Sequence, residues 1–587
     1  MSDILKKILQ PIIGIDENQE QIHADIDSFN EEDHQNENGA PVETHNPLGY
    51  NLDYVSAFYM VIQGIIGTGI FLTPASVLNS IGSVGASYVL WVAGFFIALF
   101  EVFVYVEFST YYKKRSGGDV AYLEQAYPKP DFLVPTSYAA VSVVLSFSVS
   151  SAIAFGEFVL NASGTEVTTW KERGVGVAIL TFAAILTIAN SKWSLKLANL
   201  LGFVKMVTIT FIIITGFVNL GGNTRVAEPH AVFKDAWKGS TSDGNAIANA
   251  IIKVSFSYSG TQYVFRMVGE SNPKKTKNLF RYFIPGVVIS IFFIYILLVT
   301  TFYSGFESVE AVKKSGSLVA AQFFSNVFGT KAATKALDSL IALSALGHLL
   351  TVFVGSSRTL RECGRQGVLP YPRAWTSTKP FGTPVLGVFI TWIVNLIVLL
   401  APPAGDAYNL VVDIGSYSGY FFKILLAVGL LLVRKQRKEQ GLGYQGFKCP
   451  LIFIIITLVF YLFVIAMSFV PPNNGTLIGS DVTFFYATYA LVTIGLLALC
   501  VFYYYVWAKI LPKFGGYVHR TVYYILPNGE RGHTVIQVKK DEVAKFDAEH
   551  DALGRLIDGS TEGEIEGEGD GSIEKLAFTV ESEKQLH

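Results

Sequence analysis

Long apolar runs separated by short polar loops are the feature of this sequence that most restricts its fold. A helix needs about 20 apolar residues to cross the hydrocarbon core of a bilayer. In lipid each run must satisfy its own backbone, and none alternates in polarity like a barrel strand, so all are predicted to be helices. We therefore predict an all-α membrane protein with a transmembrane core at 51–510. About 12 runs are long enough, at approximately 52–79, 83–110, 132–161, 174–190, 196–219, 246–268, 281–304, 335–358, 384–402, 408–433, 450–470 and 483–509.

Charge and cysteine content exclude several classes of protein. Charged residues make up only 16% of the 587 residues, against about 25% in soluble domains, so lipid is expected to cover most of the surface. The formal net charge of -2 supplies no basic field for nucleic acid. The three cysteines lie far apart, without metal-binding spacing. With no nucleophile triad, Walker loop or metal cluster in the loops, we expect neither an enzyme nor an ATP-driven pump, and no metal, organic cofactor or nucleic-acid partner.

The two ends of the chain are predicted to be cytosolic tails. Segments 1–50 and 511–587 are rich in charged residues and are expected to be largely disordered or weakly ordered, and segment 1–50 is not a signal peptide. An even number of helices places both tails on one side. The loops on that side carry 21 lysines and arginines, against 9 in the opposite loops. By the positive-inside rule, the side that holds the tails is the cytosol.

Two of the predicted helices carry interruptions. The first contains glycines at Gly64, Gly67 and Gly69, and the sixth contains the segment 255–261 with Gly260. Glycine weakens a helix, and interrupted helices five apart indicate inverted repeats with a substrate site near the membrane midplane. Amides freed at a helix N-terminus favour a carboxylate, and freed carbonyls accept an ammonium group. The pair of breaks suits a zwitterionic amino acid, whereas glycines that only allow close helix packing are the alternative.

Four short motifs add a family resemblance. Taken together, and in the order in which they occur along the chain, they resemble the signature elements of the L-type amino-acid transporters of the amino acid–polyamine–organocation superfamily. The resemblance implies a LeuT-like fold of two inverted five-helix repeats, with helices 1 and 6 broken and helices 11 and 12 peripheral. Loops at 165–170, 400–408, 470–475 and 506–513 are similar to those of fungal methionine permeases. The four motifs are Gly67–Phe71 followed by Pro74, Ser116–Asp119 with Tyr122 and Leu123, Glu270–Pro273, and Ser357 and Arg358 with Gly364–Pro370.

The resemblance also implies which residues bind the substrate. Its carboxylate is expected at the amides of Thr68 and Gly69, with Gly67 permitting the turn. Its ammonium group is expected at the carbonyls of Ile65, Phe256 and Ser259, and the ring of Phe256 is expected to close over it. Thr261 stands where L-type transporters often have tryptophan, and its smaller side chain is expected to widen the pocket. Gln262 is expected to add polar contacts. Gln63, Ser259 and Thr261 differ from the methionine permease pattern.

Buried charges point to the coupling ion. Lys205 lies deep in an apolar run, where a charge is costly and usually functional. In many relatives a lysine at this position replaces the sodium ion that braces helix 1, which implies a proton as the coupling ion. Glu101 and Glu157 are the candidate proton carriers. Among the other charged or titratable residues, Glu107 is expected to pair with basic loop residues, His348 is expected to be a satisfied core or cavity residue, and Lys253 and Lys423 receive no role.

The resulting interpretation is a plasma-membrane importer of an amino acid, first of all methionine, working by proton symport with alternating access. Cysteine or cystine, or a broad range of neutral amino acids, are alternative substrates. A sensor of the same fold, which binds an amino acid without transporting it, is the alternative function. In fungal permeases the N-terminal tail commonly carries ubiquitin acceptors, a role here open to Lys6 and Lys7, which are otherwise two solvated lysines.

Overall fold

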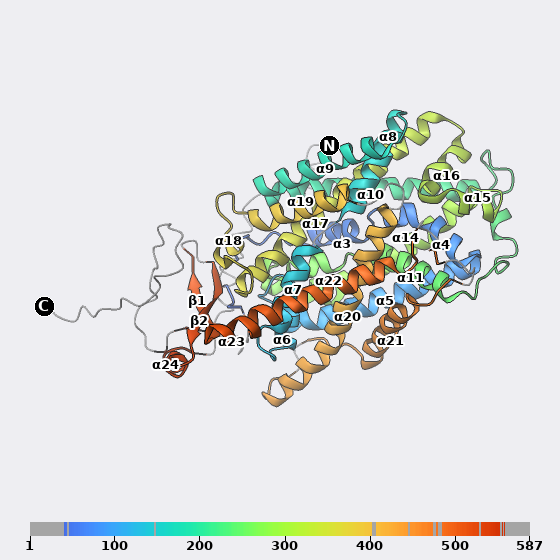
Figure 1. Ribbon diagram of the computed structural model, residues 1–587. Coiled ribbons are helices and arrows are strands. Elements are labelled where there is room, and N and C mark those ends of the chain that lie inside the picture. Colours follow the sequence, from blue (N-terminus) through green and yellow to red (C-terminus); the bar gives the residue numbers. More distant parts are fainter. Residues whose placement is uncertain are drawn as a thin grey trace.

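A bundle of long helices forms the body of the protein, with a small β-hairpin at one end (Figure 1). The computed structural model describes residues 40–557 except 44–45, 146–147, 402–406, 444–445, 473–476, 479–483, 527–529, 552–553 and 556. Lys6 and Lys7 lie outside the described residues.

Each of the predicted apolar runs contains helix. In the described part of the chain, nine helical stretches are long and apolar enough to cross a membrane, and α19 and α21 are shorter apolar helices. The expected mostly helical core of membrane type is therefore confirmed. The helices are α3 (Tyr54–Ile65), α4 (Gly69–Ile81), α5 (Val84–Tyr111), α7 (Leu133–Val144), α8 (Val149–Ser163), α9 (Thr169–Ala189), α10 (Ser191–Leu220), α11 (Gly244–Tyr258), α12 (Gln262–Phe265), α14 (Ile284–Ser304), α17 (Lys331–Arg365), α19 (Val385–Leu400), α20 (Ala407–Glu439), α21 (Leu451–Met467) and α22 (Thr488–Tyr505).

Short elements gather at the two ends of the bundle. In Figure 1, α15 and α16 lie at the right-hand end, and α18 and the hairpin lie at the left-hand end. These elements are α6 (Asp119–Ala126), α13 (Pro273–Asn278), α15 (Val309–Lys314), α16 (Val319–Phe328), α18 (Pro372–Thr376), α23 (Leu511–Gly515), β1 (Tyr517–Ile525), β2 (Arg531–Lys539) and α24 (Val543–Glu549).

Polar side chains set where several long helices begin. Asp53 caps α3 by accepting a hydrogen bond from the amide of Ser56 at 2.7 Å. Ser83 caps α5 in the same way. Asn190 ends α9 and caps α10, so these two helices are joined by a single residue. Such caps satisfy amides that have no acceptor inside their own helix.

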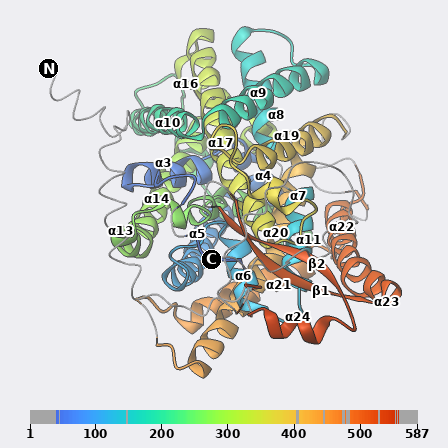
Figure 2. The same cartoon turned by 90° about the vertical axis from the view of Figure 1, so that its left-hand side faces the viewer.

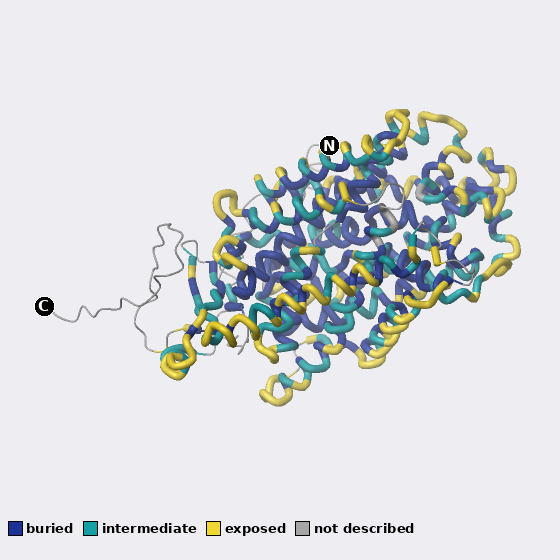
Figure 3. The backbone as a smooth tube through the Cα atoms, in the orientation of Figure 1, coloured by how far each residue is buried: buried dark blue, intermediate teal, exposed yellow. Residues whose placement is uncertain are grey.

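The outward faces of the helices are apolar. On α10, Val207, Phe211, Ile214 and Phe217 are each at least half exposed, and α21 and α22 carry similar surfaces. Buried positions fill the centre of the bundle in Figure 3, while exposed positions follow the outer faces and both ends. Monomeric soluble proteins rarely expose so much contiguous apolar surface, whereas a lipid bilayer covers it without cost.

The C-terminal segment differs from the expectation of a weakly ordered tail. Strands β1 and β2 pair antiparallel, from Tyr517 opposite Lys539 to Ile525 opposite Arg531. The hairpin lies across the end of the bundle (Figure 2) and contacts α17 and α18. The hydroxyl of Tyr524 is 2.8 Å from that of Thr376. The many charged residues of the segment favoured a weakly ordered tail. The segment nevertheless contains two nine-residue strands rich in β-branched and aromatic residues.

Glu530 fastens this hairpin to the loop after α18. Its carboxylate accepts hydrogen bonds from the amide of Thr378 at 3.0 Å and from its hydroxyl at 2.5 Å, and the residue is fully buried. We expect Glu530→Ala to weaken hairpin docking by about 1–3 kcal/mol, because the buried amide loses its acceptor. Faster hydrogen exchange in β1 and β2, with unchanged exchange in α10, would measure this loss. Glu549→Ala on α24 is the control, and equal protection in both variants would contradict the prediction.

A buried charge network occupies the same end of the bundle. One guanidinium nitrogen of Arg115 lies 2.7 Å from Glu124 and 2.8 Å from Glu362, and Arg365 lies 2.7 Å from Glu362. Burial raises the pKa of Glu124, and the adjacent Arg115 opposes this shift. Arg361 binds Glu43 at 2.6 Å, which brings the first described residues to the same end as the C-terminal hairpin. Several of the basic residues used to assign orientation, Arg115, Arg361 and Arg365 among them, are therefore held in buried pairs.

The expected pairing of Glu107 is confirmed. Its carboxylate accepts two hydrogen bonds from Arg434, at 2.8 and 2.6 Å, and a third from the amide of Cys449 at 2.5 Å. Glu107 therefore joins α5 to the end of α20 and to the segment that leads into α21.

Candidate substrate site

The two interrupted helices meet at the centre of the bundle. The first is interrupted between α3 and α4, and the second between α11 and α12. Gly260 has a φ of +127°, and a Cβ atom there would lie 2.1 Å from the carbonyl oxygen of Gly64. The two breaks thus touch through their backbones, at a distance that only glycine permits. Both predicted interruptions are present in the structure.

The first break presents amides. Helix α4 begins at Gly69 with Thr68 as its N-cap, and the Thr68 side chain makes no capping hydrogen bond. The first amides of a helix have no acceptor within that helix, and the helix dipole places partial positive charge there. Thr68 and Gly69 are both buried. The break can therefore stabilise one negative group in a place shielded from water.

The carbonyls of the breaks already have partners. The Tyr295 hydroxyl, on α14, lies 2.9 Å from the Ile65 oxygen and 2.8 Å from the Ser257 oxygen. The Phe256 oxygen accepts from the Ser259 hydroxyl at 2.8 Å. The Ile65 oxygen also accepts from the amide of Gly67 at 2.9 Å, and the Phe256 oxygen from the amide of Ser259 at 3.1 Å. An ammonium group at either carbonyl would therefore have to displace or share one of these donors. Tyr295 was missed by the sequence reasoning, although a tyrosine in an apolar run was a signal.

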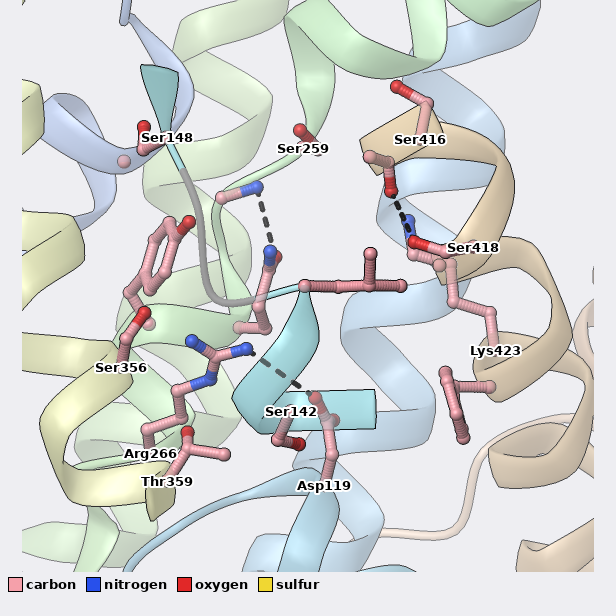
Figure 4. A pocket seen from close by; sticks show the side chains of 18 of the residues that line it. Asp119, Ser142, Ser148, Ser259, Arg266, Ser356, Thr359, Ser416, Ser418 and Lys423 are labelled. Carbon is pink, nitrogen blue, oxygen red and sulfur yellow. Dashed lines mark hydrogen bonds and ion pairs between the residues drawn. The ribbon is translucent and has the colours of Figure 1, made fainter. Parts of the chain in front are cut away.

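A cavity of about 240 Å³ lies beside these breaks. This is below the roughly 300–1,000 Å³ of pockets for drug-sized ligands, so it suits a small solute. Figure 4 shows serine and threonine hydroxyls facing the space from several elements. The lining residues from the breaks are Gly64, Ser255, Phe256, Ser259, Gly260, Gln262, Tyr263 and Arg266, and the others come from α5–α8, α17 and α20.

The predicted substrate residues divide into two groups. Phe256, Ser259 and Gln262 line the cavity. The other five are buried and do not line the cavity, namely Ile65, Gly67, Thr68, Gly69 and Thr261. The Gln262 side chain accepts from the amide of Gly260 at 2.9 Å, so it also stabilises the second break.

One ion pair and one further cation line the cavity. Arg266 lies 3.9 Å from Asp119, whose carboxylate also accepts hydrogen bonds from Tyr105 and Tyr138 (Figure 4). Lys423 also lines the cavity. Because Glu101 pairs with Lys423 from outside the lining, these charges can meet a zwitterion without leaving a large net charge at the site.

The candidate coupling residues occupy three different places. Glu101 lies 3.0 Å from Lys423 and accepts a hydrogen bond from Tyr461 at 2.8 Å. Glu157, on α8, is not among the lining residues. Lys205 is buried and donates to the carbonyl of Ile66 in the first break.

Lys253, which received no role from sequence, pairs with Asp413 at 2.8 Å between α11 and α20. The cavity also contains charged and imidazole side chains to which the sequence reasoning gave no place in the site: Asp119, Arg266, Lys423 and His348.

Comparisons with known proteins place this geometry in context. A family model described as amino acid permease matches residues 52–506. The high-affinity methionine permease of Saccharomyces cerevisiae is 32% identical over 513 residues, which cover 86% of this chain and 87% of that protein. The low-affinity methionine permease of the same organism is 26% identical over 80% of this chain and 85% of its own. The human cystine/glutamate transporter is 26% identical over 72% of this chain and 81% of its own.

Proposed function

Because the chain belongs to the amino acid permease family, we propose that it imports an amino acid across the plasma membrane, with methionine as its first candidate substrate. The two similar methionine permeases support methionine. The similar cystine/glutamate transporter keeps cystine as the second candidate. Both tails face the cytosol in this proposal, in line with the lysine and arginine content of the loops.

The observation that carries the proposal is the backbone contact between the two breaks beside a small polar cavity. The substrate carboxylate binds the amides of Thr68 and Gly69, and Phe256 closes over the substrate from the second break. The ammonium group binds carbonyls at Ile65, Phe256 or Ser259. A zwitterion fits because the site offers amides on one side and carbonyls on the other.

Transport follows from movement of the two broken helices. Helices α3–α10 and α11–α20 form two inverted repeats, and the broken helices rock against α8 and α17 in alternating access. Lys205, by its bond to Ile66, ties α10 to the first break. The proton is the coupling ion, with Glu101 and Glu157 as the carriers expected from sequence.

Uptake of radiolabelled methionine tests this function. The chain is expressed in cells that lack their own methionine permeases, with unlabelled competitors and with a protonophore. Saturable uptake that methionine blocks and the protonophore abolishes is expected. Stronger competition by cystine would change the substrate and keep the family. No uptake of any amino acid by protein present at the surface would favour a sensor.

Phe256 offers a test of the site within this assay. Phe256→Ala removes the ring that closes over the substrate, so we expect the KM of uptake to rise by about tenfold, equivalent to about 1.4 kcal/mol. Initial rates over a range of methionine concentrations, divided by surface protein, measure this change. Phe514→Ala is the control, because Phe514 is 87% exposed. An unchanged KM in Phe256→Ala would show that the ring does not contribute to substrate binding.

A further inference from the structure

His348 lies where the cavity meets the first break. Its side chain, on α17, lines the cavity, and its Nδ1 atom is 2.7 Å from the Ser151 hydroxyl on α8. A Cβ atom on Gly67 would lie 3.0 Å from the ring, and the ring also hydrogen-bonds the backbone of Gly64. The imidazole therefore bridges the two helices α8 and α17 to the interrupted helix.

The partners of this ring accommodate it with or without a second proton. In the neutral form one ring nitrogen donates and the other accepts. With the proton on Nε2, Nδ1 accepts from the Ser151 hydroxyl. A proton added at Nδ1 turns that nitrogen into a donor, and the hydroxyl can rotate to accept. Protonation thus adds a positive charge without requiring the ring to move.

The charges around the ring determine when that proton is favourable. From α10, the charge of Lys205 acts on His348, and the Lys205 amine binds the adjacent Ile66 carbonyl. From α12, Tyr263 lies edge-on with ring centroids 6.5 Å apart, and Arg266 lies over the Tyr263 ring at 4.9 Å. Ser151 on α8 and the glycines of α3 and its break are not titratable. Two buried cations beside one break repel each other strongly.

A substrate carboxylate at the first break would offset this repulsion. The carboxylate in the proposed site lies at Thr68 and Gly69, adjacent to Gly67 and therefore close to the ring. Its negative charge favours a proton on His348, and by linkage a protonated His348 favours the carboxylate by the same factor. Substrate and proton then bind together and leave together, as symport requires.

We propose that His348 takes up the cotransported proton at Nδ1 from a hydronium ion that enters the cavity, and that it returns this proton to water on the cytosolic side after the substrate departs. This inference rests on the proposed amino-acid import. The placement of the other candidates favours His348. Glu101 is held by Lys423 and Tyr461, and neither Glu157 nor Lys205 lines the cavity. His348 alone among these four both lines the cavity and contacts the break.

Proteoliposomes that contain the purified full chain separate coupling from binding. Labelled methionine exchange at equal pH reports binding and movement, whereas accumulation driven by a pH difference reports coupling. With one proton per substrate and no membrane potential, one pH unit drives about tenfold accumulation, because one unit corresponds to a factor of ten. His348→Gln, a neutral side chain with a donor and an acceptor, is expected to stop accumulation and to leave the remaining exchange insensitive to the pH difference.

His230→Gln is the matched control, because His230 lies exposed on a loop, and it should accumulate methionine like the parent. Accumulation by His348→Gln with the parental pH dependence would overturn the proposal. If this variant neither exchanges nor accumulates, methionine binding in detergent at two pH values decides. The proposal is supported if methionine affinity depends on pH in the parent and not in His348→Gln. It is overturned if the affinity depends on pH equally in both proteins. A parent chain that exchanges no amino acid refutes the import function itself.

Discussion

Gly260→Ala is expected to abolish uptake while leaving the outer helices of the bundle folded. The new Cβ atom would lie 2.1 Å from the Gly64 oxygen and 2.9 Å from the Ile65 nitrogen, which are backbone atoms that cannot rotate away. The φ of +127° adds strain for any side chain, about 1–3 kcal/mol for such a conformation. The break between α11 and α12 must therefore separate from α3, which displaces the amides of Thr68 and Gly69.

Methionine uptake per surface-exposed molecule measures this effect. Gly286→Ala on α14 is the matched control, because a Cβ atom there meets nothing within 4 Å. This control should transport normally, since alanine is favoured over glycine in a helix by about 1 kcal/mol. Parental KM and rate in Gly260→Ala would contradict the close contact of the two breaks.

Arg358→Ala is expected to destabilise the protein so strongly that most of it no longer folds. Arg358 binds Glu270 through two hydrogen bonds, at 2.9 and 3.3 Å, and both side chains are almost fully buried. Removing one partner of a buried pair leaves an uncompensated charge and costs about 3–5 kcal/mol. That loss is a large part of the about 5–15 kcal/mol by which folded proteins are stable. A lower thermal unfolding temperature in detergent and less protein at the cell surface are expected.

Two further variants separate the cost of an orphan charge from lost packing. The double variant Arg358→Met with Glu270→Met removes both charges and should recover much of the stability lost by Arg358→Ala. Lys234→Ala breaks a pair with Glu228 in which both side chains are about two-thirds exposed, and it should cost less than about 1 kcal/mol. Equal stability of Arg358→Ala and Lys234→Ala would refute the argument.

The helices could be predicted from sequence because the membrane requires long apolar runs and the loops interrupt them clearly. The breaks could be predicted because Gly64, Gly67 and Gly260 stand in otherwise helical runs. The hairpin was missed because the acidic composition after β2 dominated the interpretation of the whole tail. The hairpin has only two strands, and only their partner surface on α17 and α18 shows why they are ordered.

The site was harder to predict than the helices. A helix that is apolar on all sides has no preferred face in its sequence, so the direction of a single polar residue within it is not encoded locally. Tyr295 and His348 are such residues, and only tertiary packing brings them to the breaks. Phe256, Ser259 and Gln262 were easier to place because they lie at the break itself.

The contact between Gly64 and Gly260 also constrains how the chain is made. Helix α3 enters the membrane during synthesis long before α11 and α12 leave the ribosome. Until then its break lacks its native neighbours, and each backbone group left unsatisfied in lipid costs several kcal/mol. The break after α3 must therefore be straightened, or be shielded from lipid by the insertion machinery, until α11 and α12 have been inserted. A nascent chain halted before α11 is expected to remain bound to that machinery or to be degraded, however stable the complete protein becomes.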